Sequence, residues 1–141
     1  MPSNNSRFAI AIHTLTALAN RQLEGGALLT SQEIAASVNT NPVVIRVLIR
    51  SLKAAGLIDA KEGKDGGMWL KRSMGEILLG DVYRAVETSG ALAYNKRPEN
   101  PTCAVSRGMK KALNPIFTEV DEAIFNTLQK QTLKEVVMRI V

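Results

Sequence analysis

The sequence predicts a mainly α-helical fold with one short β-hairpin, and three observations support this prediction. Hydrophobic residues make up 45% of the 141 residues but aromatic residues only 4%, so Leu, Ile, Val and Ala must form most of the core. Apolar residues recur every three or four positions along most of the chain, which is the spacing of an amphipathic helix. The exception is LIDAKEGKDGGMWL at residues 57–70, where two short strand-like segments flank a glycine-rich turn. A chain of this length can hold one compact domain with a helical extension.

The first two helices are expected at residues 7–20 and 31–38. In the first, apolar residues follow a helical period after Ser6, a candidate N-cap. The second has the sequence SQEIAASV, and Glu33 lies three residues after Thr30, as a capping box requires. Thr30 or the serine that follows it is therefore the expected N-cap.

A third helix follows a short break at residues 39–41. Proline suits the first helical position because its missing N–H would be unpaired there, so this helix is expected to begin at Pro42. Thr40 or Asn41 would cap it, and Gly56 would end it in a left-handed conformation. Two helices joined by a tight turn form a helix-turn-helix.

The segments Leu57–Lys61 and Met68–Lys71 are expected to pair as two strands. The Asp65-Gly66-Gly67 cluster between them can supply the positive φ angles that a hairpin turn needs. A hairpin directly after a helix-turn-helix is a wing, so the predicted fold is a winged helix-turn-helix. Trp69 is expected to anchor the wing in the core rather than to stack on a base.

The character of the chain changes after residue 72. MGEILLGDVYRAVETSG at residues 74–90 contains another amphipathic helix. Residues 90–102 hold two prolines and little periodicity, so they are expected to form a loop, and residues 104–140 are helical with a wide apolar stripe. The expected organisation is a winged helix-turn-helix domain at residues 1–72 and a helical region at residues 73–141.

Three basic residues share one face of the third helix. At 100° per residue, Arg50 lies about 40° and Lys53 about −20° from Arg46 around the helix axis. The apolar residues within about 20° of the opposite direction are Val44, Leu48 and Ala55. The apolar back would pack on the domain, and the basic front would project from it. A solvated charged face is the ordinary alternative for such a stripe.

Positive charge is concentrated in the N-terminal half of the chain. Residues 1–72 hold nine Lys and Arg against five Asp and Glu, a balance of +4, whereas residues 73–141 hold nine against eight, a balance of +1. This distribution favours a polyanionic partner. No run of about 18 apolar residues is available to span a membrane. The N-terminus lacks a signal-peptide pattern, so the expected location is cytoplasmic.

The helix-turn-helix and the wing together predict binding to double-stranded DNA. A helix about 10–12 Å in diameter fits the major groove, where Arg and Lys can bind guanine or phosphate. The predicted contacts on the helices are Ser31, Thr40, Asn41, Pro42, Arg46, Arg50 and Lys53, and those on the wing are Lys61, Lys64, Gly66 and Gly67. The glycines would let the backbone approach a phosphate or the minor groove. The alternative for the wing is a simple surface hairpin.

The sequence resembles the Rrf2 family of bacterial winged-helix transcription regulators along nearly its whole length. The segments that carry the resemblance are SRFAIAIHTLTAL, SQEIAASVNTNPVVIRVLIRSLKAAGLI, DGGMWL, EILLGDVYRAVE, PTCAVSRGMKKAL and TLKEVV. The combination of the NPVVIR to AAGLI block, the glycine wing and DVYRAVE is specific, although no single piece would be.

The resemblance implies a homodimeric regulator, most simply a repressor, that reads an inverted repeat with two copies of the Arg46 helix. It also implies that the long helix at residues 114–130 pairs the subunits. The predicted dimerisation residues are Ile116, Phe117, Val120, Ile124 and Leu128. The alternative is that this helix packs within its own chain.

The sequence departs from the iron–sulfur members of that family, which carry three cysteines in the loop and at the start of the long helix. Cys103 is the only cysteine, and a cluster needs several thiolate or imidazole ligands, so no iron–sulfur cofactor and no metal is expected. Cys103 has two interpretations. Cationic neighbours such as Arg97 and Arg107 could favour a reactive thiolate that senses oxidants. Alternatively, Cys103 is a small buried apolar residue without reactivity.

Two other functions remain open at this stage. A winged helix can instead serve as a protein-interaction module without specific DNA binding, because one fold hosts many functions. The basic front of the third helix argues against this alternative. An enzyme is not expected, because the chain has one histidine, one cysteine and no phosphate-binding or metal-binding motif. Glu119, Asp121 and Glu122 are interpreted as the solvated side of a helix. No small-molecule effector can be named from the sequence.

Overall fold

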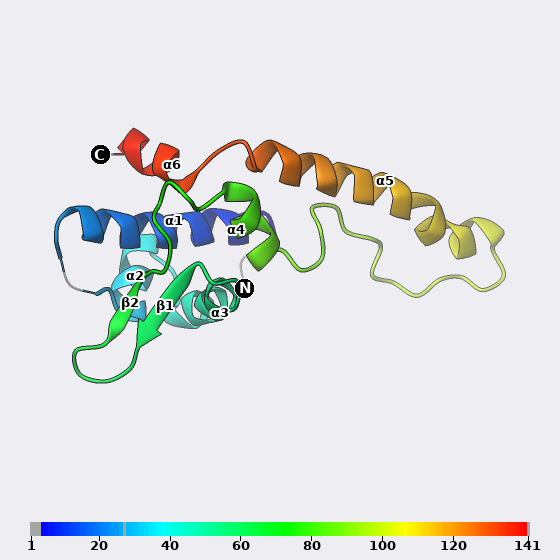
Figure 1. Ribbon diagram of the computed structural model, residues 1–141. Helices are drawn as coiled ribbons and strands as arrows, with labels where there is room; N and C mark the ends of the chain where they lie inside the picture. Colours follow the sequence, from blue (N-terminus) through cyan, green and yellow to red (C-terminus); the bar gives the residue numbers. More distant parts are fainter. Residues whose placement is uncertain (1–3, 27, 141) are drawn as a thin grey trace.

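The computed structural model describes residues 4–26 and 28–140, and one long helix projects from the packed remainder of the chain, called the body below (Figure 1). The elements in chain order are α1 (Asn4–Leu23), α2 (Ser31–Val38), α3 (Pro42–Ala54), β1 (Ile58–Lys61), β2 (Gly67–Leu70), α4 (Leu79–Val86), α5 (Ala104–Leu128) and α6 (Leu133–Ile140). The predicted mainly helical winged helix-turn-helix is confirmed. None of the described helices combines the length and the hydropathy of a membrane-spanning segment.

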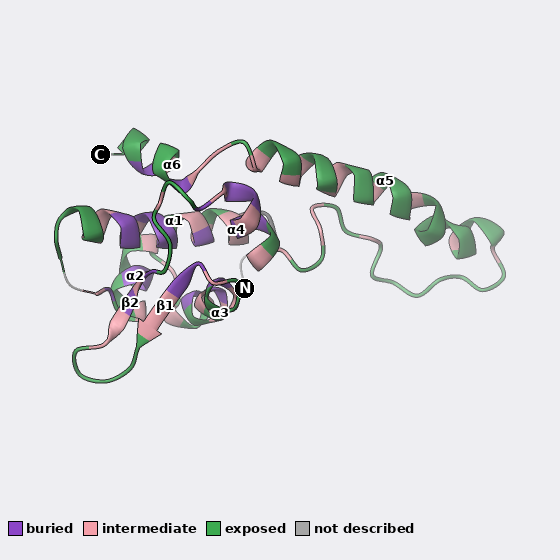
Figure 2. Cartoon of the chain, viewed as in Figure 1, coloured by how far each residue is buried: buried purple, intermediate pink, exposed green. Residues whose placement is uncertain are grey.

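One hydrophobic core holds the body together, and α1 lies at its centre. Leu15 and Leu18 of α1 are buried against apolar residues of α2, α3, the hairpin, α4 and α6. The core residues contributed from beyond residue 72 are Ile77, Val82, Val86, Leu133 and Val137. The helices α4 and α6 therefore share the core of the helix-turn-helix. Figure 2 shows the buried residues confined to the body, with α5 drawn as exposed and intermediate residues along its length.

The two helices of the helix-turn-helix begin directly after their N-cap residues, Thr30 and Asn41. Thr30 accepts a hydrogen bond from the Glu33 backbone N–H, and the Glu33 carboxylate accepts one from the Thr30 N–H, so the predicted capping box is present. Asn41 caps α3 by accepting from the Val43 N–H at 2.8 Å. By contrast, Ser6 is not an N-cap, because α1 already begins at Asn4.

The buried side of α3 is rotated from the side that the sequence predicts. Ile45, Leu48 and Leu52 are buried, whereas Val44 is only partly covered. Ala55 is exposed, since it is the C-cap residue of α3 and lies beyond the helix that packs on the body. The basic front is nevertheless kept in solvent, because Arg46, Arg50 and Lys53 are all exposed.

The wing is a two-stranded antiparallel hairpin in which Ile58 pairs with Leu70 and Lys61 with Gly67. Met68 also exchanges backbone hydrogen bonds with Leu29, which ties the wing to the segment before α2. Gly67 has a φ of 151°, and a Cβ there would lie 2.7 Å from the Leu28 Cβ, so a side chain does not fit. The turn at the tip spans residues 63–66, and its left-handed residue is Gly63 rather than Gly66.

Trp69 does not anchor the wing in the core. Side chains alternate between the two faces of a strand, and the buried neighbours Met68 and Leu70 occupy the inner face. Trp69 therefore lies on the outer face opposite Asp59, where it is only partly covered.

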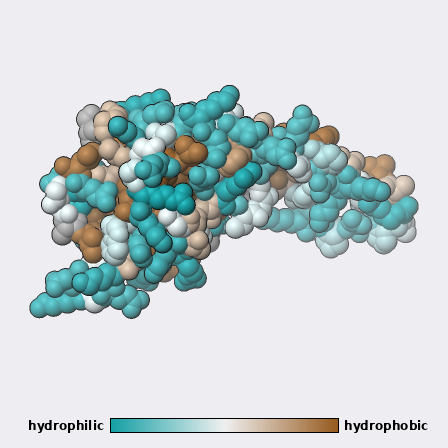
Figure 3. All heavy atoms as spheres, viewed as in Figure 1, coloured by the Kyte–Doolittle hydropathy of each residue, from teal (hydrophilic) through white to brown (hydrophobic). Residues whose placement is uncertain are grey.

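The long helix α5 leaves the body as an arm of 25 residues, none of which is buried. It is attached near its C-terminal end, where Tyr83 of α4 bonds to Asp121 and the Arg84 guanidinium lies 3.4 Å from the Phe125 ring centroid. The connection at residues 87–103 runs back along the arm, and Tyr94 stacks on Phe117 with 4.8 Å between ring centroids. Figure 3 shows apolar side chains along one edge of the projecting arm.

Candidate nucleic-acid interface

A cleft of about 400 Å³ lies between the start of α2, the exposed face of α3 and the wing. It brings together residues that are separated by more than thirty positions in the chain. The predicted DNA contacts that line it are Ser31, Arg46, Lys61, Lys64, Gly66 and Gly67. Apolar residues Ile49, Ala60 and Met68 form part of its lining and connect it to the body. The cleft can therefore receive a polyanionic backbone between Arg46 and the wing.

The remaining predicted contacts lie on α3 outside this cleft. Thr40, Asn41 and Pro42 form the N-terminal end of α3, and Arg50 and Lys53 lie further along its exposed side. The Asn41 side-chain oxygen is already engaged as the cap of α3, so only its amide group remains for a base or a phosphate.

Val43 is a candidate contact that the sequence analysis missed. Its side chain is 55% exposed in the first turn of α3. At 100° per residue it lies about 20° from Arg50 around the helix axis, on the basic side. An apolar side chain there can contact a thymine methyl group in the major groove. The signal was available in the sequence, since a valine on the charged face breaks the amphipathic pattern.

The basic residues of this surface are not neutralised by the chain itself. Within the described residues the ion pair that forms is Arg21–Glu33, with 3.5 Å between Arg21 Nη2 and Glu33 Oε2. The hydrogen bond from the Thr30 backbone N–H lowers the pKa of Glu33 and keeps this capping carboxylate ionised. Arg46, Lys61 and Lys64 therefore present their charges to solvent, with Glu62 as the acidic residue that lines the same cleft.

This arrangement suits double-stranded DNA in shape and in charge. A projecting helix can enter the major groove while cationic and glycine-rich loops bind the neighbouring phosphates. Unpaired Lys and Arg side chains gain free energy by displacing the counterions that surround DNA.

The chain is similar to proteins that are named as transcription regulators. The chain is 38% identical over 132 residues to YwnA of Bacillus subtilis, which is provisionally named an HTH-type transcriptional regulator, and the match covers 94% of this chain and 95% of YwnA. A crystal structure provisionally described as a DNA-binding protein superposes with a TM-score of 0.69 and 37% identity, covering 93% of this chain and 98% of that one.

CymR of B. subtilis, titled the global cysteine regulator of that organism, has the same fold. Its TM-score is 0.67 at 20% identity, over 99% of this chain and 98% of CymR. Residues 4–139 match the Rrf2 family, whose description is an iron-dependent transcriptional regulator. The resemblance noted from the sequence is thereby confirmed, and the chain belongs to the Rrf2 family of transcriptional regulators.

Proposed function

We propose that the protein is a homodimeric, sequence-specific transcriptional repressor that binds an inverted-repeat operator. The observation that carries this proposal is the cleft in which Arg46 of α3 faces Lys61 and Lys64 of the wing, with none of the three in an ion pair with a described carboxylate. In the proposed complex, α3 lies in the major groove with Val43, Arg46 and Arg50 towards the bases. Lys53 and the wing lysines bind phosphates, and a promoter covered in this way is closed to transcription.

Pairing of two chains through α5 is supported by an apolar seam on the arm. Val105, Met109 and Ile116 are 67%, 45% and 55% exposed, although all three are large apolar residues. Steps of three or four residues along one face of α5 connect Val105, Met109, Ala112, Ile116, Val120 and Ala123. This spacing is typical of helices that pair with another helix, and leaving it in water is costly.

The predicted dimerisation residues divide into two groups. Ile116 is exposed on the apolar seam and is available to a second chain. Val120 lies on the same seam but is half-buried in the single chain. Phe117 packs within its own chain on Tyr94, and Ile124 and Leu128 are half-buried in the single chain. We add Val105 and Met109 to the proposed pairing surface, because α5 begins at Ala104 and both side chains are exposed.

The charges on α5 favour an antiparallel pair. Its N-terminal half carries Arg107, Lys110 and Lys111, and its C-terminal half carries Glu119 and Glu122 on the exposed surface. Antiparallel pairing places the basic half of one helix beside the acidic half of the other. The bodies then lie at opposite ends of a pair of helices, each about 37 Å long at 1.5 Å per residue. This length is close to the roughly 34–36 Å between successive major-groove segments on one side of DNA.

We further propose that the protein works without a resident iron or iron–sulfur group, unlike the family description. Cys103 is the only cysteine of the sequence. In the described part of the chain, no three His, Cys, Asp or Glu side chains come together closely enough to hold a metal ion. The residues present therefore do not fit an iron group, which needs several such ligands.

We also propose that the thiol of Cys103 senses oxidants. Cys103 is the N-cap residue of α5, is partly exposed, and makes no capping hydrogen bond with its side chain. Arg107 donates from Nη1 to the Pro101 carbonyl at 2.7 Å, so this guanidinium is engaged by the loop. Oxidation at the start of the arm would act on the same helix that is proposed to pair the subunits.

The test of the main proposal is selection of operators from random DNA duplexes, carried out with reduced and oxidised protein in parallel. The expected result is one enriched inverted repeat whose affinity falls steeply with salt concentration. Placing that repeat across a promoter should lower transcription in a purified system. If no sequence were enriched at low salt, the surface would be assigned to a protein partner, as in the interaction-module alternative.

A further inference from the structure

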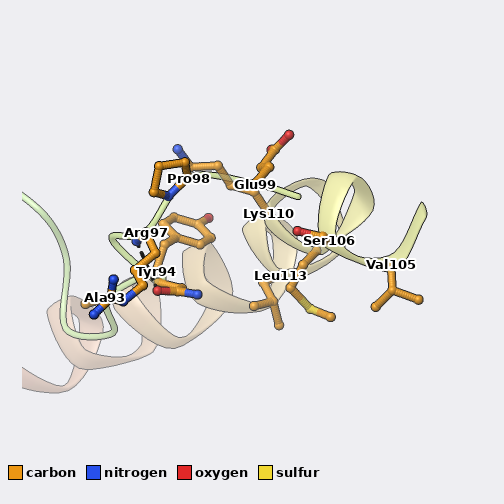
Figure 4. Close-up of a pocket in the computed structure, with 11 residues that line it drawn as sticks. Ala93, Tyr94, Arg97, Pro98, Glu99, Val105, Ser106, Lys110 and Leu113 are labelled. Atoms are coloured by element: carbon orange, nitrogen blue, oxygen red, sulfur yellow. Dashed lines mark hydrogen bonds between the residues drawn. The ribbon is translucent and has the colours of Figure 1, made fainter. Parts of the chain in front are cut away.

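A second concave site lies far from the wing, between the 87–103 connection and the first turns of α5 (Figure 4). Its volume is about 290 Å³. Tyr94 and Arg97 face it from the loop, and Val105, Met109, Lys110 and Leu113 face it from the helix. We infer that this cavity binds a small organic anion with an aromatic or aliphatic body.

The walls of the cavity are held in place by specific contacts. The Tyr94 ring stacks on Phe117 and is thereby fixed against α5. The Asn100 N–H donates to Ser106 Oγ at 2.8 Å, and Arg107 binds the Pro101 carbonyl. A loop without regular secondary structure is thus fastened to the helix at both ends of the cavity. A site formed in advance loses less entropy when a ligand binds.

The chemistry of the lining points to an anion that also has an apolar part. Lys110 Nζ lies 5.5 Å from the Tyr94 ring centroid, and Arg97 is the second cation of the lining. Glu99 is the one carboxylate that lines the cavity, so the balance of its charged lining residues is +1. Met109 and Val105 offer exposed apolar surface directly beside these cations. A carboxylate near Lys110 and Arg97 would therefore lie next to a surface that accepts a hydrocarbon group.

The size of the cavity limits the ligand to a compact acid. Its volume of about 290 Å³ is at the lower end of ligand pockets, which range over roughly 300–1,000 Å³. One or two fused rings, or a short aliphatic chain, with a single carboxylate would fit. A bare metal cation is disfavoured, because the cations exceed the carboxylate in the lining.

The position of the cavity gives a bound ligand access to the dimer. Val105 and Met109 belong both to the cavity and to the apolar seam, so an occupant would lie beside the partner subunit. An effect of the ligand on DNA affinity rests on the proposed function. Binding itself is measured on the protein without DNA, and repeating it on the Ile116→Glu variant, which is expected to be monomeric, separates it from the proposed pairing, so the two ideas fail separately.

The experiment is a titration of the full-length ¹⁵N-labelled protein with 1-naphthoate and with its neutral isostere 1-naphthamide, followed by amide chemical shifts. We expect saturable shifts at residues 93–113 with naphthoate and binding of naphthamide that is about tenfold weaker. Lys110→Gln should weaken naphthoate binding about tenfold. Lys111→Gln is the matched control, because Lys111 is exposed on the same helix and does not line the cavity.

Several results would overturn the inference. These are the absence of saturable shifts at residues 93–113 up to the solubility limit of the acid, equal affinity for the acid and the amide, and equal weakening by Lys110→Gln and Lys111→Gln. The spectra of the variants also report whether each remains folded, so a lost fold cannot be mistaken for a lost site.

Discussion

The hydroxyl of Tyr83 donates a hydrogen bond of 2.5 Å to Oδ1 of Asp121, and this bond joins α4 of the body to the α5 arm. Burial, the hydrogen bond to Asp121 and the charges of Asp121 and Glu87 together raise the pKa of Tyr83 far above its ordinary value. Tyr83 therefore remains a proton donor at every physiological pH. Asp121 is a structural partner of Tyr83 and does not belong to a purely solvated acidic face.

Glu87 lies beside this junction and should make stability depend on pH. Burial and the negative charge of Asp121 raise the pKa of Glu87, and Arg7 opposes them. Its Oε1 is buried without a hydrogen-bond partner among the described residues. Because the folded pKa exceeds the unfolded one, ionisation of Glu87 costs stability as pH rises, and this cost disappears below the unfolded pKa of about 4.3.

We therefore expect Glu87→Gln to raise the melting temperature at about pH 7, with a gain that shrinks towards about pH 4. Thermal unfolding of both proteins across this range measures the effect. Glu119→Gln is the matched control, since Glu119 is exposed on α5. A gain that is the same at every pH would contradict the assignment of the effect to the carboxylate charge.

Arg46→Ala should weaken specific DNA binding and leave the fold intact. A bidentate contact between arginine and a base contributes about 1–3 kcal/mol, so the affinity for the selected operator should fall by roughly 5-fold to 150-fold. Because Arg46 is exposed, the free energy of unfolding should change by less than about 0.5 kcal/mol. Fluorescence anisotropy with operator and random duplexes measures this loss. Arg139→Ala, an exposed arginine on α6, should bind as the wild type does.

Ile116→Glu should weaken the proposed dimer by at least about tenfold, because it places a charge in the middle of the apolar seam. The monomer should still fold, since the Ile116 side chain is 55% exposed in the single chain. Sedimentation equilibrium gives the dimer dissociation constant. Thr118→Glu adds the same charge about 160° away around α5 and should have little effect. Equal dimerisation of both variants would place the interface elsewhere.

Iron should not influence DNA binding by this protein. Cys103 alone cannot hold a cluster, so operator affinity should be the same with added ferrous iron and with a chelator. Protein prepared anaerobically should contain far less than one iron per chain by elemental analysis. Stoichiometric iron, or operator affinity that depends on it, would disprove the proposal and show that ligands are shared between chains.

Cys103→Ser separates the two interpretations of the thiol. Under the sensor interpretation, diamide or peroxide changes the operator affinity of the wild type and leaves the variant unchanged. A full response in the variant would exclude Cys103 as the sensor. Absence of any response in the wild type would assign Cys103 a structural role at the start of α5.

The helix-turn-helix could be predicted closely because its signals are local. Thr30, Glu33 and Asn41 bond to backbone groups within three residues, so the sequence alone defines where α2 and α3 begin. The turn of the wing was predicted less well. Three glycines stand within five positions there, and the sequence does not say which of Gly63, Gly66 and Gly67 takes a positive φ.

Other predictions were wrong because they depended on the exact end of a helix, on the alternation of a strand or on a tertiary contact. Ala55 fits the apolar face of a helical wheel, but the helix ends before it. Trp69 was assigned to the core by its hydrophobicity, whereas the strand alternation fixed by Met68 and Leu70 turns it outward. Phe117 belongs to the same apolar stripe as Ile116. In the folded chain, however, the ring of Tyr94 from the 87–103 connection stacks on Phe117, and the sequence does not predict this contact.

The attachment of α5 near its C-terminal end makes the rest of the arm a lever. From Asp121 to the first residue of the helix, Ala104, the arm extends over 121 − 104 = 17 residues, or about 26 Å. A swing of about 8° at the Tyr83–Asp121 pivot would move its tip by about 3.5 Å, nearly the rise of one base pair. A shift of one base pair would move α3 of one subunit out of register with its half-site. Loss of the Tyr83–Asp121 hydrogen bond would therefore decide whether both copies of α3 bind the same stretch of DNA.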